Sequence, residues 1–201
     1  MIENLSIGTR SWTNQAWQSF FPEDLPVDWQ LDYYSHYFNC VLVPETQWLA
    51  WTEQQLIDFA EALEGEGFEF FFELKASFVE QTGKQFTAIK SHFQSMAVGI
   101  LMIDTAQSLP DQLNDFHVTL FSETESLPGW RWHYNGEVCS GYPLGYVSNL
   151  PVEGKMQSSC LQSFMDSLPP DLEKAHFIVA DEALAIESVQ NLKIIAEVMG
   201  F

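Results

Sequence analysis

The stretch Leu5-Ser6-Ile7-Gly8-Thr9-Arg10-Ser11-Trp12 begins as an apolar strand and then runs into small, cationic and aromatic residues. This order is typical of a strand in a parallel α/β barrel, where functional side chains gather at the C-terminal ends of the strands. Arg10 stands out because the chain has eight Lys and Arg residues against 28 Asp and Glu. We therefore expect Arg10 to meet either an anionic ligand or a carboxylate of the protein itself.

The composition describes one acidic globular domain spanning residues 1–201. The chain has 201 residues, of which 46% are hydrophobic, so it can bury a core of ordinary size. Its formal net charge of -20 disfavours nucleic acid and anionic membranes, which bind proteins through Lys and Arg. We interpret the acidity mainly as a solvated surface that keeps the protein soluble.

The sequence predicts a cytoplasmic location and no membrane association. Its first residues, Met1 to Asn4, do not form the charged and then apolar pattern of a signal peptide. The longest apolar run, Met96 to Ile103, is far shorter than the roughly 20 residues that cross a bilayer. The three cysteines form no CxxC pair, which favours reduced thiols over disulfides.

Patterns typical of strands and helices alternate along the chain, as in successive βα units. After the strand that begins at Leu5, we predict strands at 40–43, 68–75, 98–104, 116–121, 129–134 and 176–180, and helices at 29–38, 52–65, 84–96, 158–168 and 182–199.

The connection after the fifth predicted strand is unusually short. Residues 122–128 cannot hold a crossover helix, because a parallel connection usually needs a dozen residues or more. We therefore predict an α/β fold of the TIM-type (β/α) barrel class that is incomplete, with about seven strands and one βα unit missing after strand five. Such a barrel would be open or distorted there, and a partner could cover the exposed edge.

The predicted strand at 68–75 has two unlike faces. Period two places Phe71, Glu73 and Lys75 on one face and only apolar side chains on the other. Because the apolar face should meet the surrounding helices, Glu73 and Lys75 are expected to point into the barrel near its C-terminal rim.

The chain resembles the YecE-like family, also known as domain of unknown function seventy-two, whose members fold as TIM-type barrels. The resemblance rests on several short motifs that occur in the family's order: Ile7-Gly8-Thr9-Arg10-Ser11-Trp12, Trp17, Phe21-Pro22, Tyr33-Tyr34, Phe38-Asn39, Phe71 to Lys75, Arg131-x-His133 and Asn191. The first 80 residues carry most of it.

Two polar positions of the family pattern are absent from this chain. Where the family has Glu-x-Asn after strand two, this sequence has Leu42 and Pro44, and where the family has Arg-His after strand five, it has Phe121-Ser122. The resemblance therefore implies a divergent, shortened member with a reduced set of rim residues.

Three of the eight basic residues fall at predicted C-terminal strand ends: Arg10, Lys75 and Arg131. One interpretation is a cationic patch that binds a small anion. The other is a set of structural ion pairs with rim carboxylates, because buried Lys and Arg are usually paired; the carboxylates available are Glu45, Glu73, Asp104, Glu123 and Asp181. As ligand-binding candidates we name Arg10, Lys75, Arg131, Trp12 and Asp181, with Trp12 suited to stacking on a ring.

His133 is the candidate for general acid–base chemistry, since it lies near a predicted strand end; a structural role is the alternative. No HxxxH or HExxH spacing is present, so we expect no metal site. The sequence also lacks a P-loop, a GxGxxG motif and a Gly-x-Ser-x-Gly elbow, so we expect no cofactor and no hydrolase triad.

We therefore predict a barrel protein that binds a small anionic or phosphorylated ligand at the C-terminal rim of its strands. The alternative is a degenerate, non-catalytic relative that acts as a binding or scaffold protein through its acidic surface. The sequence does not decide between them, nor does it reveal the oligomeric state.

Overall fold

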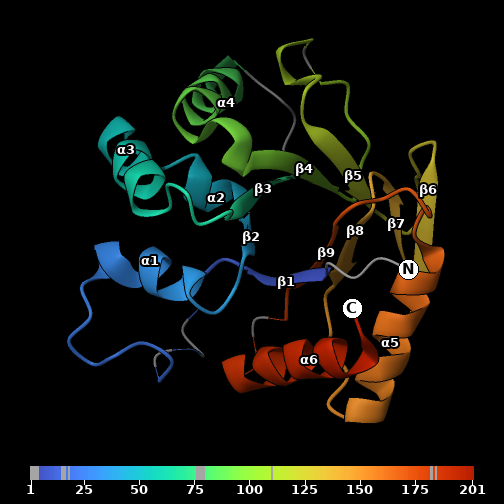
Figure 1. Ribbon diagram of the computed structural model, residues 1–201. Helices are drawn as coiled ribbons and strands as arrows, with labels where there is room; N and C mark the ends of the chain where they lie inside the picture. Colours follow the sequence, from blue (N-terminus) through green and yellow to red (C-terminus); the bar gives the residue numbers. More distant parts are fainter. Residues whose placement is uncertain are drawn as a thin grey trace.

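The protein folds as a mixed α/β structure around a nearly closed, barrel-like sheet (Figure 1). The computed structural model describes residues 5–14, 17, 19–75, 80–109, 111–181, 183 and 185–201, with the backbone alone for Glu80 and Gln112. The strands are β1 (Leu5–Arg10), β2 (Cys40–Val43), β3 (Glu69–Leu74), β4 (Ala97–Ile103), β5 (His117–Phe121), β6 (Trp130–Tyr134), β7 (Glu137–Gly141), β8 (Leu144–Val147) and β9 (Ala175–Val179).

The helices lie outside the sheet. They are α1 (Gln30–Ser35), α2 (Glu45–Trp48), α3 (Glu53–Ala62), α4 (Glu80–Phe93), α5 (Gly154–Ser167) and α6 (Ile186–Met199), with short 3-10 turns η2 (Val27–Trp29), η3 (Gln94–Met96) and η4 (Asp111–Leu113). Figure 1 shows α1, α3 and α4 on one side of the strands and α5 and α6 on the other. No helix within the described ranges has the length and apolar character needed to cross a membrane.

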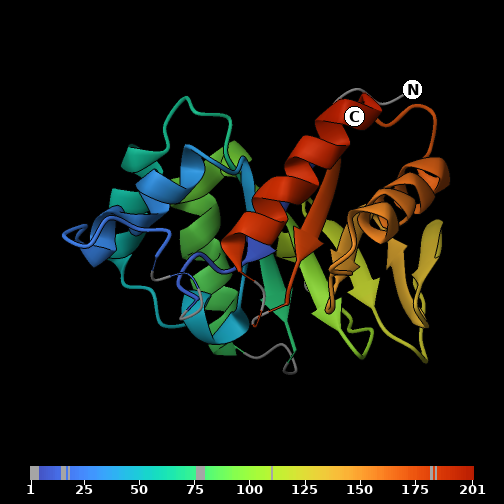
Figure 2. The same ribbon diagram turned by 90° about the horizontal axis from the view of Figure 1, so that it is seen from below.

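The sheet order is β6-β7-β5-β4-β3-β2-β1-β9-β8. Every pair from β5 through to β8 is parallel, whereas β7 is antiparallel to both β5 and β6. In Figure 2 the arrowheads of the parallel strands point toward one end of the molecule, which is the C-terminal rim. The parallel order brings the ends of β1, β2 and β3 together at this rim.

The prediction of about seven strands is wrong in count, because the described chain forms nine. The predicted strands at 116–121 and 129–134 do form β5 and β6, but they are not neighbours. Instead, β7 folds back from β6 and pairs with β5 in antiparallel register, with Thr119 opposite Gly141. A β-hairpin therefore takes the place of the predicted missing βα unit, and the edge of β5 that was expected to be open is paired.

The hairpin depends on a two-residue turn. Asn135 and Gly136 both have positive φ, 49° and 87°, and they join β6 to β7. Consecutive positive φ angles match the right-handed twist of the flanking strands, and Asn-Gly adopts them at little cost. On the outside, Trp130 and Trp132 donate indole hydrogen bonds of 3.1 Å to Ser167 and Ser163 of α5, so this helix covers the hairpin.

The sheet nearly closes where β7 meets β8. The Cys139 thiol donates to the Tyr146 carbonyl oxygen at 3.8 Å, and the rings of Phe121 and Tyr146 lie 4.5 Å apart. Strand β8 is formed by the run Leu144-Gly145-Tyr146-Val147, which we did not predict as a strand. It pairs in parallel with β9 and is the last strand of the sheet at this end.

Strand β3 has the two faces that its alternation predicts. Phe70 and Phe72 contact Phe93 and Phe86 of α4, with ring centroids 4.6 and 5.7 Å apart. On the other face Phe71 is buried and contacts the His176 ring at 4.9 Å, across the barrel interior. The apolar face thus packs on helices, and the face with Glu69, Phe71 and Glu73 fills the barrel.

Gly8 allows β1 and β2 to approach closely. A Cβ atom there would lie 2.2 Å from the Cys40 carbonyl oxygen and 2.8 Å from the Cys40 sulfur. We predict that Gly8→Ala lowers the free energy of unfolding by at least about 1–3 kcal/mol, the usual cost of overpacking. Urea unfolding tests this, with Gly154→Ala as the control because its Cβ would only reach Ile195 at 3.7 Å. Equal stability of the two variants would contradict the prediction.

Candidate functional site

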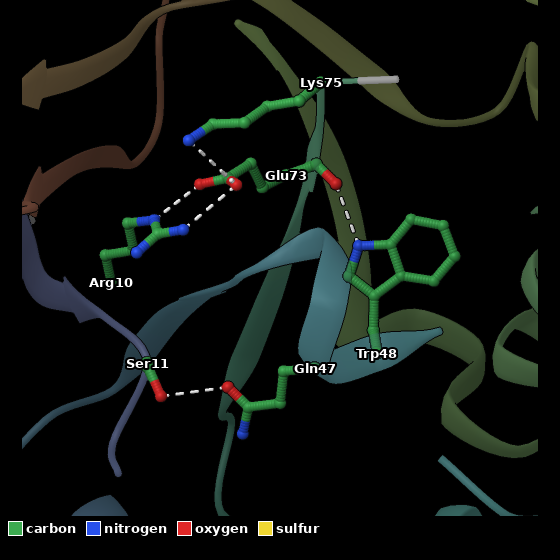
Figure 3. Close-up of polar contacts among 6 residues, drawn as sticks. All are labelled: Arg10, Ser11, Gln47, Trp48, Glu73 and Lys75. Carbon is green, nitrogen blue, oxygen red and sulfur yellow. Dashed lines mark hydrogen bonds and ion pairs between the residues drawn. The ribbon is translucent and has the colours of Figure 1, made fainter. Parts of the chain in front are cut away.

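Three charged side chains meet at the C-terminal rim, and we call Arg10, Glu73 and Lys75 the rim cluster (Figure 3). The Arg10 guanidinium donates from Nε to Glu73 Oε2 at 2.5 Å and from Nη2 to Oε1 at 3.1 Å. Lys75 Nζ lies 3.5 Å from the same Oε1. Two of the three cations expected at the rim therefore converge on one carboxylate.

The members of the rim cluster differ greatly in exposure. The Glu73 side chain is 2% exposed, that of Arg10 16% and that of Lys75 52%. Arg10 and Glu73 form a two-bond, mostly buried ion pair, whose geometry is the strongest that a guanidinium offers. Lys75 is a looser partner that keeps about half of its side chain in solvent.

The short helix α2 holds the backbone around the cluster. The Trp48 indole donates to the Glu73 carbonyl oxygen at 2.8 Å, which fixes the end of β3. The Ser11 hydroxyl donates to the Gln47 side-chain oxygen at 2.9 Å, just beyond the end of β1 (Figure 3). Because Trp48 and Gln47 are adjacent, one helical turn sets the spacing between the strands that carry Arg10 and Glu73.

Tyr146 of β8 adds a buried phenol to this end of the barrel. Burial raises the pKa of Tyr146 well above its ordinary value, and the negative charge of Glu73 raises it further, while Arg10 lowers it. The phenol therefore stays protonated at neutral pH. Sequence reasoning missed this residue because the strand that carries it was not predicted, although Leu144 to Val147 is an uninterrupted run of strand-compatible residues.

The other predicted ligand-binding residues do not join the rim cluster. Trp12 is 3% exposed and packs on Trp51 and Phe59, with ring centroids 6.1 and 5.7 Å away. Arg131 is exposed on β6 and bonds to the Ser126 hydroxyl. Asp181 accepts a hydrogen bond from the Ala183 backbone N–H at 3.1 Å, in a local turn after β9.

His133, the candidate acid–base residue, is exposed on β6, the last strand of the sheet order at the hairpin end. Arg131 and His133 were expected on a barrel strand, but the hairpin places β6 outside the parallel set. No group of three or more His, Cys, Asp or Glu side chains gathers as a metal site within the described part of the chain.

The two positions that depart from the family pattern have structural contacts. Leu42 is fully buried on β2. The Ser122 hydroxyl donates to the Asp104 carbonyl oxygen at 2.6 Å and accepts from the backbone N–H of Thr124 and Glu125. These residues shape the core and the loops at the rim and supply no charge.

A second charged group lies at the opposite end of the barrel, and we call Glu69, Lys174 and His176 the floor cluster. Glu69 Oε2 bonds to Lys174 Nζ and lies 2.8 Å from His176 Nε2, while His176 Nδ1 is buried without a partner among the described residues. Burial alone would raise the pKa of Glu69, but hydrogen bonds and charge from His176 and Lys174 hold it below its usual value.

The rim cluster generates a stability prediction. Glu73→Gln removes the charge that Arg10 and Lys75 share and leaves a largely buried guanidinium without its carboxylate. Breaking a buried ion pair in this way typically costs about 3–5 kcal/mol. Urea unfolding should show a loss of this order for Glu73→Gln and almost none for the exposed control Glu66→Gln. A loss below about 1 kcal/mol would mean that the pair adds little.

The floor cluster generates a pH prediction. A carboxyl whose pKa is lowered on folding stabilises the protein above its unfolded value of about 4.3, and this contribution disappears as the pH falls through the folded pKa. Glu69→Gln should therefore be less stable than the parent at pH 7, with the gap narrowing toward pH 3. Exposed Glu64→Gln is the control. A gap that stays constant across this range would refute the assignment.

A comparison with protein families finds a match in the first part of the chain. The family model described as protein of unknown function DUF72 matches residues 6–120. Neither a curated protein nor a solved structure matches the chain. The matched segment runs from β1 to the penultimate residue of β5, so it contains the whole rim cluster and stops just before the hairpin. Since the match covers more than half of the 201 residues, the chain belongs to the DUF72 family of proteins of unknown function.

Proposed function

We propose that the protein binds a small molecule bearing an anionic group, such as a carboxylate or phosphate, at the C-terminal rim of the barrel. The observation that carries the proposal is the convergence of two cations on one carboxylate, which leaves one positive charge in excess within the rim cluster of a chain whose formal charge is -20. In TIM barrels, which this nearly closed sheet resembles through its parallel strands, active sites lie at the C-terminal rim.

Lys75 is the residue best placed to contact such a ligand. Its ammonium lies 3.5 Å from Glu73 and its side chain is 52% exposed, so its pairing with Glu73 is weak and easily exchanged. Arg10 is committed to Glu73 by two hydrogen bonds. In this proposal Arg10 neutralises and orients Glu73, and Lys75 swings toward the anion.

The same contacts at Glu73 also support a second function, that of a non-catalytic binding protein. Glu73 can be regarded as having satisfied both cations, and the two departures from the family pattern have removed polar groups from the rim. On that reading the protein is a non-catalytic binding or scaffold protein that acts through its acidic surface.

Titration with inorganic phosphate and with acetate separates the two functions. If the rim binds anions, phosphate should raise the melting temperature by mass action, and Lys75→Ala should weaken binding at least about fivefold by calorimetry, the equivalent of one charge-assisted contact of roughly 1 kcal/mol. Lys75→Arg should retain most of the affinity.

Lys155→Ala is the matched control, because Lys155 is exposed at the start of α5. Equal responses of the parent, Lys75→Ala and Lys155→Ala to phosphate would reject the rim as the anion site. The ligand-free melting temperatures of the three proteins show whether the lysine substitutions alter stability by themselves.

A further inference from the structure

We propose that an aromatic surface on α1 and the segment before it binds a basic polypeptide segment through its Lys and Arg side chains. The surface, which we call the aromatic face, consists of Phe20, Phe21, Trp29, Tyr33 and Tyr37. The ribbon of α1 and of the segment before it lies on the side of the molecule away from the β6–β7 hairpin, as both views show (Figures 1 and 2). This proposal does not depend on the anion site at the rim.

Two residues of the aromatic face, Trp29 and Tyr37, are exposed, and the other three are partly buried. Trp29 is 63% exposed and Tyr37 is 38% exposed, and neighbouring Val27 is 71% exposed. Trp29, Tyr33 and Tyr37 are spaced four residues apart through η2, α1 and the turn that follows, so they fall along one side of the helix. Within the described ranges, no ring contact covers Trp29. A tryptophan exposed in this way is typical of binding surfaces.

The other four rings of the aromatic face contact one another. The Phe20 ring centroid lies 4.9 Å from that of Phe21, 5.3 Å from Tyr33 and 5.1 Å from Tyr37. The Tyr33 and Tyr37 hydroxyls are hydrogen bonded at 3.2 Å. Because these rings are already held by one another, their own side chains lose little conformational entropy when a partner docks on them.

The negative charge close to the aromatic face favours a positively charged partner. The segment that carries the aromatic face, residues 20–37, contains four Asp and Glu residues and no Lys or Arg. Glu23, Asp24 and Asp28 are exposed in the same segment, and Asp28 adjoins Trp29 in sequence. Such a surface repels acidic peptides, nucleic acid, anionic membranes and a second copy of this chain, and it attracts cations.

The structure contains one example of the proposed chemistry at the border of this face. Lys193 of α6 places its ammonium 5.2 Å from the Phe38 ring centroid and donates a hydrogen bond to the Tyr37 carbonyl oxygen. The Phe38 ring in turn lies 6.4 Å from Phe20. The Lys193 contact places a cation over an aromatic ring with a hydrogen-bond acceptor nearby. In our proposal, exposed Trp29 supplies the ring and adjoining Asp28 supplies the acceptor for a cation of the partner.

Fluorescence anisotropy with a labelled peptide of alternating Arg and Leu tests the proposal. We expect Trp29→Ala to weaken binding at least about fivefold, the effect of losing a cation–π contact of about 1 kcal/mol, and Trp29→Phe to restore part of it. Asp28→Asn should weaken binding mainly at low ionic strength. The matched controls are Val198→Ala, 83% exposed on α6, and Glu123→Gln, exposed after β5; neither should change the affinity.

Three outcomes would overturn the proposal. The first is an affinity of Trp29→Ala equal to that of the parent, which would make the attraction a general effect of net charge. The second is equal binding of a peptide with Gln in place of Arg, which would make the contact purely apolar. The third is a concentration-dependent dimer in sedimentation that Trp29→Ala abolishes, which would identify a second copy as the occupant.

Discussion

Two carboxylates on the inward face of β3 are the constraint on which the barrel depends. Glu69 and Glu73 point into the interior on either side of Phe71, and a carboxylate taken out of water must find a cation. Glu73 finds Arg10 on β1, and Glu69 finds Lys174 and His176 at the start of β9. In the sheet order these partners lie two and three strands away from β3.

These distances along the sheet explain why the ion pairs favour a curved sheet. Neighbouring strands are spaced about 4.8 Å apart, so β3 and β9 in a flat sheet would be separated by about 14 Å. Yet Glu69 Oε2 lies 2.8 Å from His176 Nε2. Curvature of the sheet shortens the gap that side chains on its concave face must span. The ion pairs inside the barrel and the curvature of its sheet therefore support each other. Phe71 fills the space between the two clusters.

The sequence contained the information for β3 and for the rim pair, because strict alternation in 68–75 separates Glu73 and Lys75 from the apolar face. It also contained a signal for the hairpin that our prediction did not use: Asn135-Gly136 between two strand-like runs is the strongest short-range mark of a two-residue turn. We took the short link at 122–128 as evidence of a deletion, whereas β7 supplies an antiparallel neighbour for β5. The positions of Arg131 and His133 could not be predicted without that pairing, since they depend on which strand lies beside β5.

The match to the family model ends just before the part of the chain that leads into the hairpin. The family match stops at residue 120, and β5 ends at Phe121. Up to that point, each strand pairs in parallel with its predecessor, and the rim cluster is built entirely from β1 and the end of β3. Beyond it, Trp130 and Trp132 anchor β6 to α5, β8 follows β7 with no helix between them, and α5 carries the chain from β8 to the parallel strand β9. None of the three residues of the rim cluster comes from the hairpin, whereas Tyr146 of β8, which lies beyond the match, is close enough for its phenol to respond to the charges of Glu73 and Arg10.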